Sequence, residues 1–554
     1  MLRAAVAQIN PTVGDIEGNR NKILEYTAHA RKLGADIVAF PELVLCGYPP
    51  EDLLYKPSFI SANKNAIKQI ASSTKGIVSI VGFANKSGSD IYNSAAVISK
   101  GKIRGVYDKV CLPNYSVFDE KRYFQKGRAS SLFDLGGITF GINICEDIWQ
   151  KKNPVKVYKD AGIKIIFAIN ASPYCMGKIN EREEVVKRQA RANNAFVVYA
   201  NLVGAQDELV FDGQSFIASG KGKIVARADA FSEDLLIADL DVDPGEKSSG
   251  RIISLGAVTG SRKKPITQRY AKRPEPLNEV YEALTAGLKD YVFKNGFKKV
   301  IIGLSGGIDS ALVAAISRDA LGAERTVGVF MPSAYTSKES KRDAGALAEN
   351  LGIELYTVPI GNVLESYMDE LKGIFKGQPK NVAEENLQAR IRGNILMALS
   401  NKFGYLVLNT GNKSEISCGY CTLYGDMAGG FSVIKDVPKM LVYKLARLVN
   451  SEKQIIPDAV LRKAPTAELK PNQKDADTLP PYEVLDPILK AYVEENKGLR
   501  EIAKLGFDRK MVSRVVRMVD ANEYKRRQAP PGIKITPRAF GKDRRMPITN
   551  NFTG

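Results

Sequence analysis

Histidine is nearly absent from this sequence: the 554 residues include a single one, His29. Histidine is the usual general base of catalytic triads and a common metal ligand. His29 lies in NKILEYTAHARKLG, where the spacing of apolar residues predicts an amphipathic helix and a surface or packing role for its imidazole. Ser-His-Asp and Cys-His catalysis are therefore disfavoured, as are histidine-rich metal sites, and catalysis is expected to use Cys, Lys, Asp, Glu, Ser, Thr or Tyr.

Other absences limit the class of protein. No apolar run approaches the roughly 18 residues needed to span a bilayer, and the first residues, MLRAAVAQIN, lack the apolar core of a signal peptide. Six cysteines are scattered along the chain, and the one CxxC, Cys418 and Cys421, has no second pair with which to bind zinc. With 44% hydrophobic and 25% charged residues the composition is that of a globular protein. We expect a cytoplasmic protein with no membrane association.

The formal net charge is +19. Such an excess is typical of proteins that bind nucleic acid or anionic small molecules such as ATP and dinucleotides. The basic residues are spread along the chain apart from the cluster Lys525, Arg526 and Arg527, and no motif dedicated to RNA or DNA binding occurs. The charge therefore favours a solvated surface and anionic substrates over a nucleic-acid partner.

The length predicts two or more domains, because one core seldom grows to this size. Residues 1–257 mix short apolar strands, such as ADIVAF and GITFGINIC, with amphipathic helices, which is a layered α/β pattern. Residues 258–276, VTGSRKKPITQRYAKRPEP, are polar and basic and are the predicted linker. In residues 277–554, strands and helices alternate from KKVIIGLS to YLVLNTGN. This alternation predicts a doubly wound parallel sheet whose ligands bind beyond the carboxyl ends of the strands. The tail from about residue 530 is predicted to be irregular.

Three reactive residues follow predicted strands in the first half. Glu42 lies in FPELVL, Lys109 in VYDKVCL, and Cys145 ends GITFGINIC. Singly, such a cysteine is more often an inert packed thiol, and a lone Glu or Lys is usually a solvated charge. Together they make a chemistry that needs no histidine. A carboxylate in a closed site can take the thiol proton, and an ammonium can lower the thiol pKa and stabilise an oxyanion.

The motifs FPE, KxxL and CED, in this order, resemble those of the nitrilase (carbon–nitrogen hydrolase) superfamily over about residues 1–250. The resemblance implies a four-layer α-β-β-α sandwich with Glu42 as general base, Lys109 as oxyanion stabiliser and Cys145 as nucleophile. The segments KVCLPNYSVFDEKRYF, NICEDIW and NASPY also resemble the glutaminase domain of bacterial NAD synthetases. L-Glutamine is then the implied substrate, and packing alone explains Tyr115 and Trp149 equally well. The implied glutamine-binding residues are Tyr115, Glu146, Trp149, Ser172 and Lys178.

Residues 299–316, KVIIGLSGGIDSALVAAI, combine a buried strand, a Gly-rich turn and a helix. Backbone N–H groups at such a turn bind phosphate. No Gly-Lys-Ser/Thr occurs, which excludes a Walker-type P-loop. SGGIDS resembles the signature of the N-type ATP pyrophosphatases, which adenylate a substrate and release pyrophosphate, and the resemblance implies Mg²⁺ binding by Asp309. The implied ATP-binding residues of this loop are Gly303, Leu304, Ser305, Gly306, Gly307, Ile308, Asp309 and Ser310.

Four further segments, ENLQARIRGN, NTGNKSEISCGYCTLYGDMAG, KDVPK and KAPTAEL, resemble the NAD synthetases within that superfamily. The resemblance departs at Leu423, where ammonia-dependent relatives carry a lysine before Tyr-Gly-Asp, so a dinucleotide contact through that lysine is absent or replaced. Metal binding is implied for Asp309 and Glu415. The other implied contacts are Thr410, Lys439 and Thr466 with ATP, and Asn386, Arg390, Glu415 and Lys525 with deamido-NAD.

A glutaminase and an adenylating domain on one chain together predict an ATP-dependent carbon–nitrogen ligase. MgATP would adenylate the nicotinate carboxylate of deamido-NAD, and ammonia from glutamine would displace AMP to give NAD. The resemblance also implies a homo-oligomer. One alternative is a tRNA-modifying enzyme that adenylates a base with the same loop, and another is a ligand-sensing module without turnover. The glutaminase half and the lack of an RNA-binding motif favour the ligase.

Overall fold

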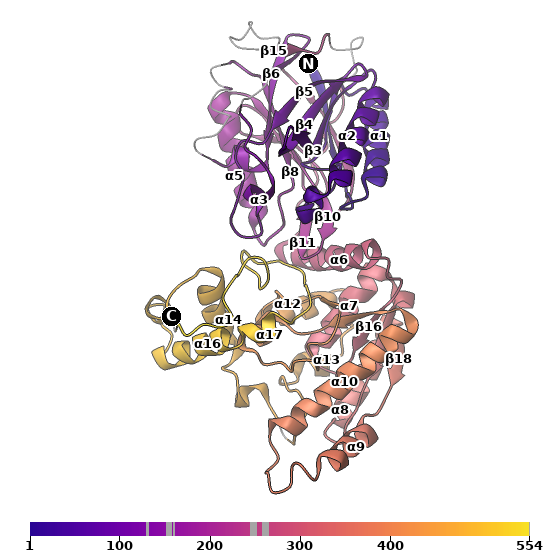
Figure 1. Cartoon of the computed structure of the whole chain (residues 1–554), viewed down its shortest axis with the longest axis vertical. Coiled ribbons are helices and arrows are strands. Elements are labelled where there is room, and N and C mark those ends of the chain that lie inside the picture. The colour runs from indigo at the N-terminus through magenta and orange to yellow at the C-terminus, as the bar shows by residue number, and fades with distance from the viewer. Residues whose placement is uncertain are drawn as a thin grey trace. The chain divides into compact units, whose positions relative to one another are not determined.

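The computed structural model describes residues 1–128, 132–150, 158, 161–243, 252–257, 265–471 and 473–552. The chain divides into two units, Met1–Pro274 and Glu275–Gly554 (Figure 1). The predicted linker, residues 258–276, spans this division, and its residues 258–264 lie outside the described residues. The second unit begins with helix α6 (Pro276–Lys294), which has a proline in its first position, where the missing N–H costs no hydrogen bond.

Two β-sheets form the first unit. Strand β1 (Leu2–Gln8) buries all seven of its residues, which is the pattern of a strand covered on both faces. The first sheet has the order β14 (Asp234–Leu240), β1, β2 (Ile37–Ala39), β3 (Val78–Ser87), β4 (Asp90–Ser99), β5 (Lys102–Asp108). The second has the order β13 (Ile224–Arg227), β12 (Phe216–Ala218), β9 (Phe196–Asn201), β8 (Ile165–Asn170), β7 (Ile138–Ile144), β6 (Leu132–Leu135), β15 (Ile252–Ser254).

The two sheets pack face to face with helices on their outer faces. Val6 and Ile80 of the first sheet share a buried cluster with Ile142 and Phe167 of the second. Helices α1 (Ile16–Lys32) and α2 (Pro57–Ser73) pack side by side over the first sheet, and α5 (Lys178–Asn193) packs on the second (Figure 1). The predicted four-layer sandwich is therefore confirmed. The remaining elements are η1 (Glu51–Tyr55), α3 (Glu120–Tyr123), η2 (Cys145–Ile148) and the hairpin β10 (Val203–Gln206) to β11 (Leu209–Asp212).

A five-stranded sheet forms the centre of the second unit, and all of its pairings are parallel. The chain proceeds outward from β16 in one direction and then in the other, so the order reverses between β16 and β19. Ligands of such sheets bind at this reversal, beyond the carboxyl ends of the strands. The doubly wound sheet predicted from the sequence is confirmed. Its order is β18 (Glu354–Thr357), β17 (Thr326–Phe330), β16 (Val300–Gly303), β19 (Leu406–Asn409), β20 (Phe431–Ser432).

The helices around this sheet begin and end at residues suited to those positions. Helix α8 (Lys338–Leu351) is capped by the Ser337 side chain and ends at Gly352, whose φ of +67° suits a residue without a Cβ. The other helices are α7 (Ile308–Leu321), α9 (Gly361–Leu371), α10 (Val382–Phe403), α11 (Lys413–Cys418), α12 (Lys439–Val449), α13 (Asp458–Arg462), α14 (Tyr482–Leu489), α15 (Leu499–Ala503), α16 (Arg509–Ala521) and α17 (Glu523–Arg526), with short turns η3 (Ala323–Arg325), η4 (Asp475–Asp477) and η5 (Lys490–Glu494).

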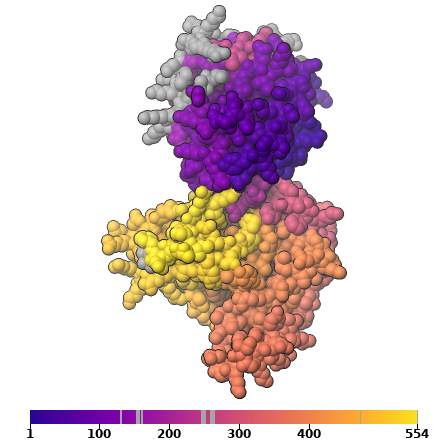
Figure 2. Space-filling model, viewed as in Figure 1, coloured from indigo at the N-terminus to yellow at the C-terminus, as the bar shows by residue number. Residues whose placement is uncertain are grey.

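The C-terminal tail is irregular, as predicted, yet it is part of the second unit's interior. Ile533 and Ile535 are fully buried. The Asp436 carboxylate accepts hydrogen bonds from the backbone N–H groups of Ile535, at 2.8 Å, and Thr536, at 2.7 Å. Figure 2 shows C-terminal residues (yellow) over much of the visible surface of this unit. No helix in the described part of the chain is both long and apolar enough to cross a bilayer.

Candidate active sites

The Lys109 ammonium lies at the centre of a buried cluster of charges in the first unit. Lys109 directly follows β5, and its Nζ donates to Oε1 of Glu42 at 2.7 Å and to Oε1 of Glu120 at 2.8 Å. The three side chains are at most 5% exposed. Asn93 on β4 donates to Oε1 of Glu42 at 2.7 Å, and the backbone N–H of Ala171 donates to its Oε2 at 2.9 Å. Two residues predicted to be catalytic thus meet, and the carboxylate of Glu42 is held in one orientation.

Cys145 stands in the same cluster, as the first residue of η2 and directly after β7. Its backbone φ is +44°, a left-handed conformation that residues with a Cβ seldom adopt and that is often found at functional sites. Burial raises the pKa of the thiol well above its ordinary value, the Glu42 carboxylate raises it further, and the Lys109 ammonium lowers it. The free thiol is therefore protonated, and a nucleophilic role for it would need a neighbouring base, such as the predicted base Glu42, to accept the proton.

The carboxylate of Asp147 joins the two loops that carry the nucleophile and the lysine. It accepts hydrogen bonds from the backbone N–H of Ile144 at 3.0 Å and of Cys111 at 2.7 Å. The first of these groups precedes Cys145 and the second follows Lys109. One buried carboxylate therefore fixes the sulfur relative to the ammonium.

The residues predicted to bind glutamine lie as two contacting pairs and one separate residue. The Tyr115 hydroxyl donates to the Glu146 carboxylate at 2.8 Å. The Lys178 ammonium lies 4.5 Å from the centre of the Trp149 ring, a distance typical of a cation–π contact. The buried Ser172 hydroxyl accepts a hydrogen bond from Arg182 at 3.1 Å. Their contacts with glutamine remain predictions.

Glu120 is a second carboxylate at Lys109 that sequence reasoning missed. It lies in FDEKRYF on the short helix α3, where a charged residue suggests exposure to solvent. Instead it is buried, and the Tyr48 hydroxyl donates to its Oε1 at 3.0 Å. Its Oε2 has no hydrogen-bond partner among the described residues. Burial raises the pKa of Glu120 to about 7, against the opposing effect of the Lys109 ammonium, so this carboxyl group gains or loses its proton near neutrality.

Replacing Glu120 by Gln is expected to flatten the pH dependence of stability. Its pKa rises from 4.5 to about 7 on folding, so between these values the native chain holds a proton that the unfolded chain releases. The free energy of unfolding therefore falls as pH rises through this window, and the glutamine variant loses that slope. Thermal unfolding between about pH 4.5 and about pH 8 measures it.

The matched control for this experiment is Glu17→Gln, because the Glu17 side chain is 80% exposed in the same unit. This variant is expected to keep the slope of the unmodified chain. An unchanged slope in Glu120→Gln would show that Glu120 is ionised throughout.

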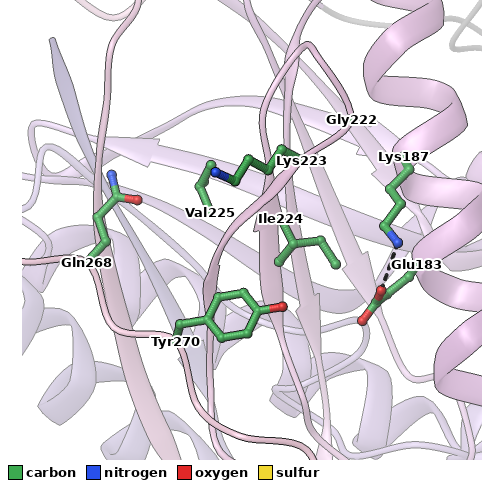
Figure 3. A pocket seen from close by; sticks show the side chains of 8 residues that line it. All are labelled: Glu183, Lys187, Gly222, Lys223, Ile224, Val225, Gln268 and Tyr270. Atoms are coloured by element: carbon green, nitrogen blue, oxygen red, sulfur yellow. Dashed lines mark ion pairs between the residues drawn. The ribbon is translucent and has the colours of Figure 1, made fainter.

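A hollow elsewhere on the first unit contains none of the predicted site residues. It is formed by α5, the turn before β13 and residues 268–270, and Glu183 pairs there with Lys187 at 3.1 Å (Figure 3). The hollow is therefore not part of the buried cluster around Lys109. Its lining residues are Glu183, Lys187, Gly222, Lys223, Ile224, Val225, Gln268 and Tyr270.

In the second unit, a cavity of about 300 Å³ opens beyond the carboxyl ends of β16 and β19. This is the position expected for the ligand of a doubly wound sheet. Gly306, Asn386, Arg390 and Lys525 do not line it. The predicted site residues that do are Gly303, Leu304, Ser305, Gly307, Ile308, Asp309, Ser310, Thr410, Glu415, Lys439 and Thr466.

Gly306 does not line the cavity, and it packs against helix α8 instead. Its φ is +78°, and a Cβ there would lie 2.7 Å from the backbone oxygen of Ser340 and 2.8 Å from its Cα. The Ser305 hydroxyl accepts a hydrogen bond from the Gly307 N–H at 3.2 Å. The loop thus packs against the first turn of α8 at a distance that only glycine allows.

Replacing Gly306 by Ala is expected to weaken the ATP-dependent ligation predicted from the sequence about tenfold or more, because the clash with Ser340 and the left-handed φ displace the loop. The glutamine hydrolysis predicted for the first unit should be unaffected. Steady-state rates at saturating glutamine measure both reactions. Gly345→Ala on α8 is the control, since a Cβ there meets nothing within 4 Å. Equal activity in the two variants would contradict the prediction.

The Lys439 ammonium joins the two residues predicted to bind metal. Its Nζ pairs with Oδ2 of Asp309 and, at 3.1 Å, with Oε1 of Glu415. Asn412 donates to Oδ1 of Asp309 at 2.9 Å. Burial and the neighbouring carboxylates of Asp309 and Asp475 raise the pKa of Glu415 to about 8, and the Lys439 ammonium opposes this rise. Two carboxyl groups thus share one ammonium.

Two adjacent carboxyl groups fit Mg²⁺, which usually takes one or two protein carboxylates together with phosphate and water. Among the residues described, no group of three or more His, Cys, Asp or Glu side chains could hold a metal by itself. Nucleotide phosphates would have to supply the remaining ligands.

Three of the predicted deamido-NAD residues contact the segment after α11. The Asn386 side-chain oxygen accepts a hydrogen bond from Thr422 at 2.8 Å, and Arg390 Nε donates to the Leu423 carbonyl at 3.2 Å. Lys525 Nζ donates to the carbonyls of Gly419, at 2.7 Å, and Cys421, at 2.9 Å. The lysine therefore stabilises the carboxyl end of α11.

Several charged residues that had no role predicted from the sequence line the cavity, although all of them except Asp475 lie in the segments that resemble NAD synthetases. Lys463 pairs with Glu468 at 2.7 Å, and the Glu468 carboxylate also accepts from the Ser340 hydroxyl at 2.9 Å. Isolated charges like these look the same in a sequence as charges on a solvated surface. The charged residues of this kind are Arg392, Asp426, Lys463, Glu468 and Asp475.

Two family models match the chain, "Carbon-nitrogen hydrolase" over residues 3–246 and "NAD synthase" over residues 280–529. Curated proteins named glutamine-dependent NAD(+) synthetase from Thermotoga maritima and Aquifex aeolicus are each 49% identical to it. The alignments cover 100% of this chain and 99% and 100% of those proteins. The chain belongs to the glutamine-dependent NAD(+) synthetases. The ATP-dependent ligase with glutamine as nitrogen donor, predicted from the sequence, is confirmed, and the tRNA-modifying alternative is not supported.

Solved structures agree with this membership of the glutamine-dependent NAD(+) synthetases. The synthetase from Acinetobacter baumannii, in complex with adenosine diphosphate, is 44% identical, with a TM-score of 0.77, and the match covers 99% of this chain and 98% of that one. The synthetase from Cytophaga hutchinsonii, at 22% identity and a TM-score of 0.83, shares the fold.

Proposed function

We propose that Cys145, Glu42 and Lys109 hydrolyse L-glutamine, and that the cavity at β16 and β19 uses the ammonia to convert deamido-NAD to NAD. The observation that carries the proposal is the buried Lys109 ammonium, which pairs with Glu42 at 2.7 Å beside the Cys145 turn. This arrangement provides a nucleophile, a base and an oxyanion stabiliser without histidine.

Glutamine hydrolysis proceeds in two steps. Glu42 accepts the Cys145 proton as the sulfur bonds to the side-chain amide carbon, and Lys109 stabilises the oxyanion. The Glu42 carboxyl group returns the proton to the leaving nitrogen, so that ammonia departs and a γ-glutamyl thioester remains. Glu42 then deprotonates a water molecule that attacks the thioester, which releases glutamate and restores the thiol.

Adenylation takes place in the second unit. The nicotinate carboxylate of deamido-NAD attacks the α-phosphorus of ATP, and pyrophosphate leaves. Backbone N–H groups of the loop from Ser305 to Ser310 donate hydrogen bonds to the departing pyrophosphate. Ammonia then attacks the activated carbonyl carbon and AMP leaves. Mg²⁺, held by Asp309 and Glu415, would neutralise phosphate charge. Lys439 orients these two carboxylates through its ion pairs.

The deamido-NAD contacts include a replacement for the lysine missing at position 423. Arg390 donates to the Leu423 carbonyl, so its guanidinium brings a cation to the neighbourhood where ammonia-dependent relatives carry that lysine. Asn386, Glu415 and Lys525 complete the proposed set. Homo-oligomer formation and a cytoplasmic location remain predictions from the sequence.

The function is tested by incubating the chain with glutamine, MgATP and deamido-NAD and quantifying NAD, AMP, pyrophosphate and glutamate. NAD, AMP and pyrophosphate are expected in equal amounts, with at least as much glutamate. A parallel reaction without deamido-NAD should give no AMP. Glutamate without NAD in the complete mixture would contradict the synthetase half of the proposal.

A further inference from the structure

Arg392 lies on the face of α10 that covers the cavity in the second unit. Ala389, Arg392, Gly393 and Leu396 all line the cavity, at the three- and four-residue spacing of one helix face. Leu396 reaches the end of β16, where its Cδ1 would lie 3.4 Å from a Cβ on Gly303. This face of the helix therefore stands over the start of the SGGIDS loop.

The guanidinium of Arg392 has little compensation for its burial. Its Nε donates to the carbonyl of Met331 at 3.0 Å. Within the described ranges, no carboxylate lies within ion-pair distance of Arg392 and no other acceptor receives its N–H groups. Burial lowers the pKa of Arg392 to about 10, and Glu468 raises it only in part. Arg392 is partly buried, and an anion that pairs with such a partly desolvated cation stabilises it.

Glu468 already has a cation, Lys463, as its partner. Its Oε1 accepts from Lys463 at 2.7 Å, from the Ser337 hydroxyl at 2.8 Å and from the Ser340 hydroxyl at 2.9 Å, and its Oε2 accepts from the Ser337 N–H at 3.3 Å. The cavity wall near Glu468 thus carries two cations, Arg392 and Lys463, for one carboxylate. An anionic ligand would balance this charge.

The same wall of the cavity adjoins the SGGIDS loop, residues 305–310. Ser340, which Glu468 binds, packs its backbone against Gly306. An anion between Arg392 and this loop would therefore be a nucleotide phosphate. A guanidinium suits that role, because its planar N–H groups match phosphate oxygens in pairs.

We propose that Arg392 binds the triphosphate of ATP and holds the pyrophosphate as it leaves. The proposal rests on the function proposed above, in which this cavity adenylates deamido-NAD. Four of the five guanidinium N–H donors remain after the bond to Met331, enough for a bidentate phosphate contact.

The test measures the binding of MgATP and of inorganic pyrophosphate to the full chain by calorimetry, for Arg392→Gln and Arg392→Lys. Arg392→Gln loses a charged hydrogen bond, so we expect it to bind both ligands about 10- to 100-fold more weakly. Arg392→Lys keeps the charge and should retain part of the affinity. The KM for deamido-NAD and the rate of glutamine hydrolysis should not change. Lys402→Gln, an exposed charge near the end of the same helix, is the control.

Two outcomes would overturn the proposal. Unchanged binding of both ligands with a lowered thermal midpoint would make Arg392 a structural residue. A higher KM for deamido-NAD alone would assign the guanidinium to the dinucleotide. Failure of the unmodified chain to make NAD would instead overturn the proposed function, and the pyrophosphate titration would remain interpretable.

Discussion

Replacing Cys145 by Ala is expected to abolish glutamine-dependent NAD synthesis while leaving ammonia-dependent synthesis intact. Without the sulfur no thioester forms, and removal of a covalent nucleophile lowers kcat by roughly 10⁴-fold or more. The cavity of the second unit is lined only by residues of that unit. It should therefore use ammonia from added ammonium chloride as the nitrogen source. NAD formation with each nitrogen donor, measured side by side, tests both halves of the expectation.

Cys46→Ala is the matched control, because it removes another buried thiol of the same unit. It is expected to retain glutamine hydrolysis. If Cys145→Ala loses ammonia-dependent synthesis as well, the two sites are not separable and the assignment of roles to the two units is wrong.

Replacing Asp309 by Asn is expected to abolish NAD synthesis from both nitrogen donors. The change preserves shape but removes the charge that pairs with Lys439 and that would bind Mg²⁺. Loss of such a preorganised charge in an adenylation site costs about 10²- to 10³-fold in kcat. Glutamine hydrolysis should survive, and pyrophosphate release measures the lost step.

The metal role of Asp309 is separated from its ion pair by measuring ATP binding with and without Mg²⁺. The variant should bind MgATP more weakly than the unmodified chain but metal-free ATP equally well. Asp319→Asn, on the same helix α7, is the control. Equal weakening of both ATP forms would assign Asp309 to the loop's architecture instead of to the metal.

The fold could be predicted where burial is uniform. Strand β16 is buried along its first three residues and is followed by glycines, so the strand and its turn are evident from the sequence. Strand β5 is different: its first three residues are exposed, because it lies at the edge of its sheet. The short polar segment KIRGVYD therefore gives little periodic signal.

The site could be predicted only as far as motifs extend. Glu42 and Lys109 are 67 residues apart, and only the order of their motifs suggested that they meet. Glu120 lies 11 residues from Lys109 in a polar segment, and its burial follows from the packing of α3 against the sandwich. Lys525 and Arg392 bind backbone carbonyls, contacts that depend on the folded path of other segments and leave no trace in sequence.

The buried tail has a consequence for synthesis of the protein on the ribosome. Asp436 gains its backbone partners only when residues 535 and 536 have emerged, and Ile533 and Ile535 fill the interior of the second unit at the same stage. The first unit can fold during translation, because its sheets are complete long before. Nascent chains cut short before Ile533 would therefore carry a folded first unit joined to an unfinished, aggregation-prone second unit.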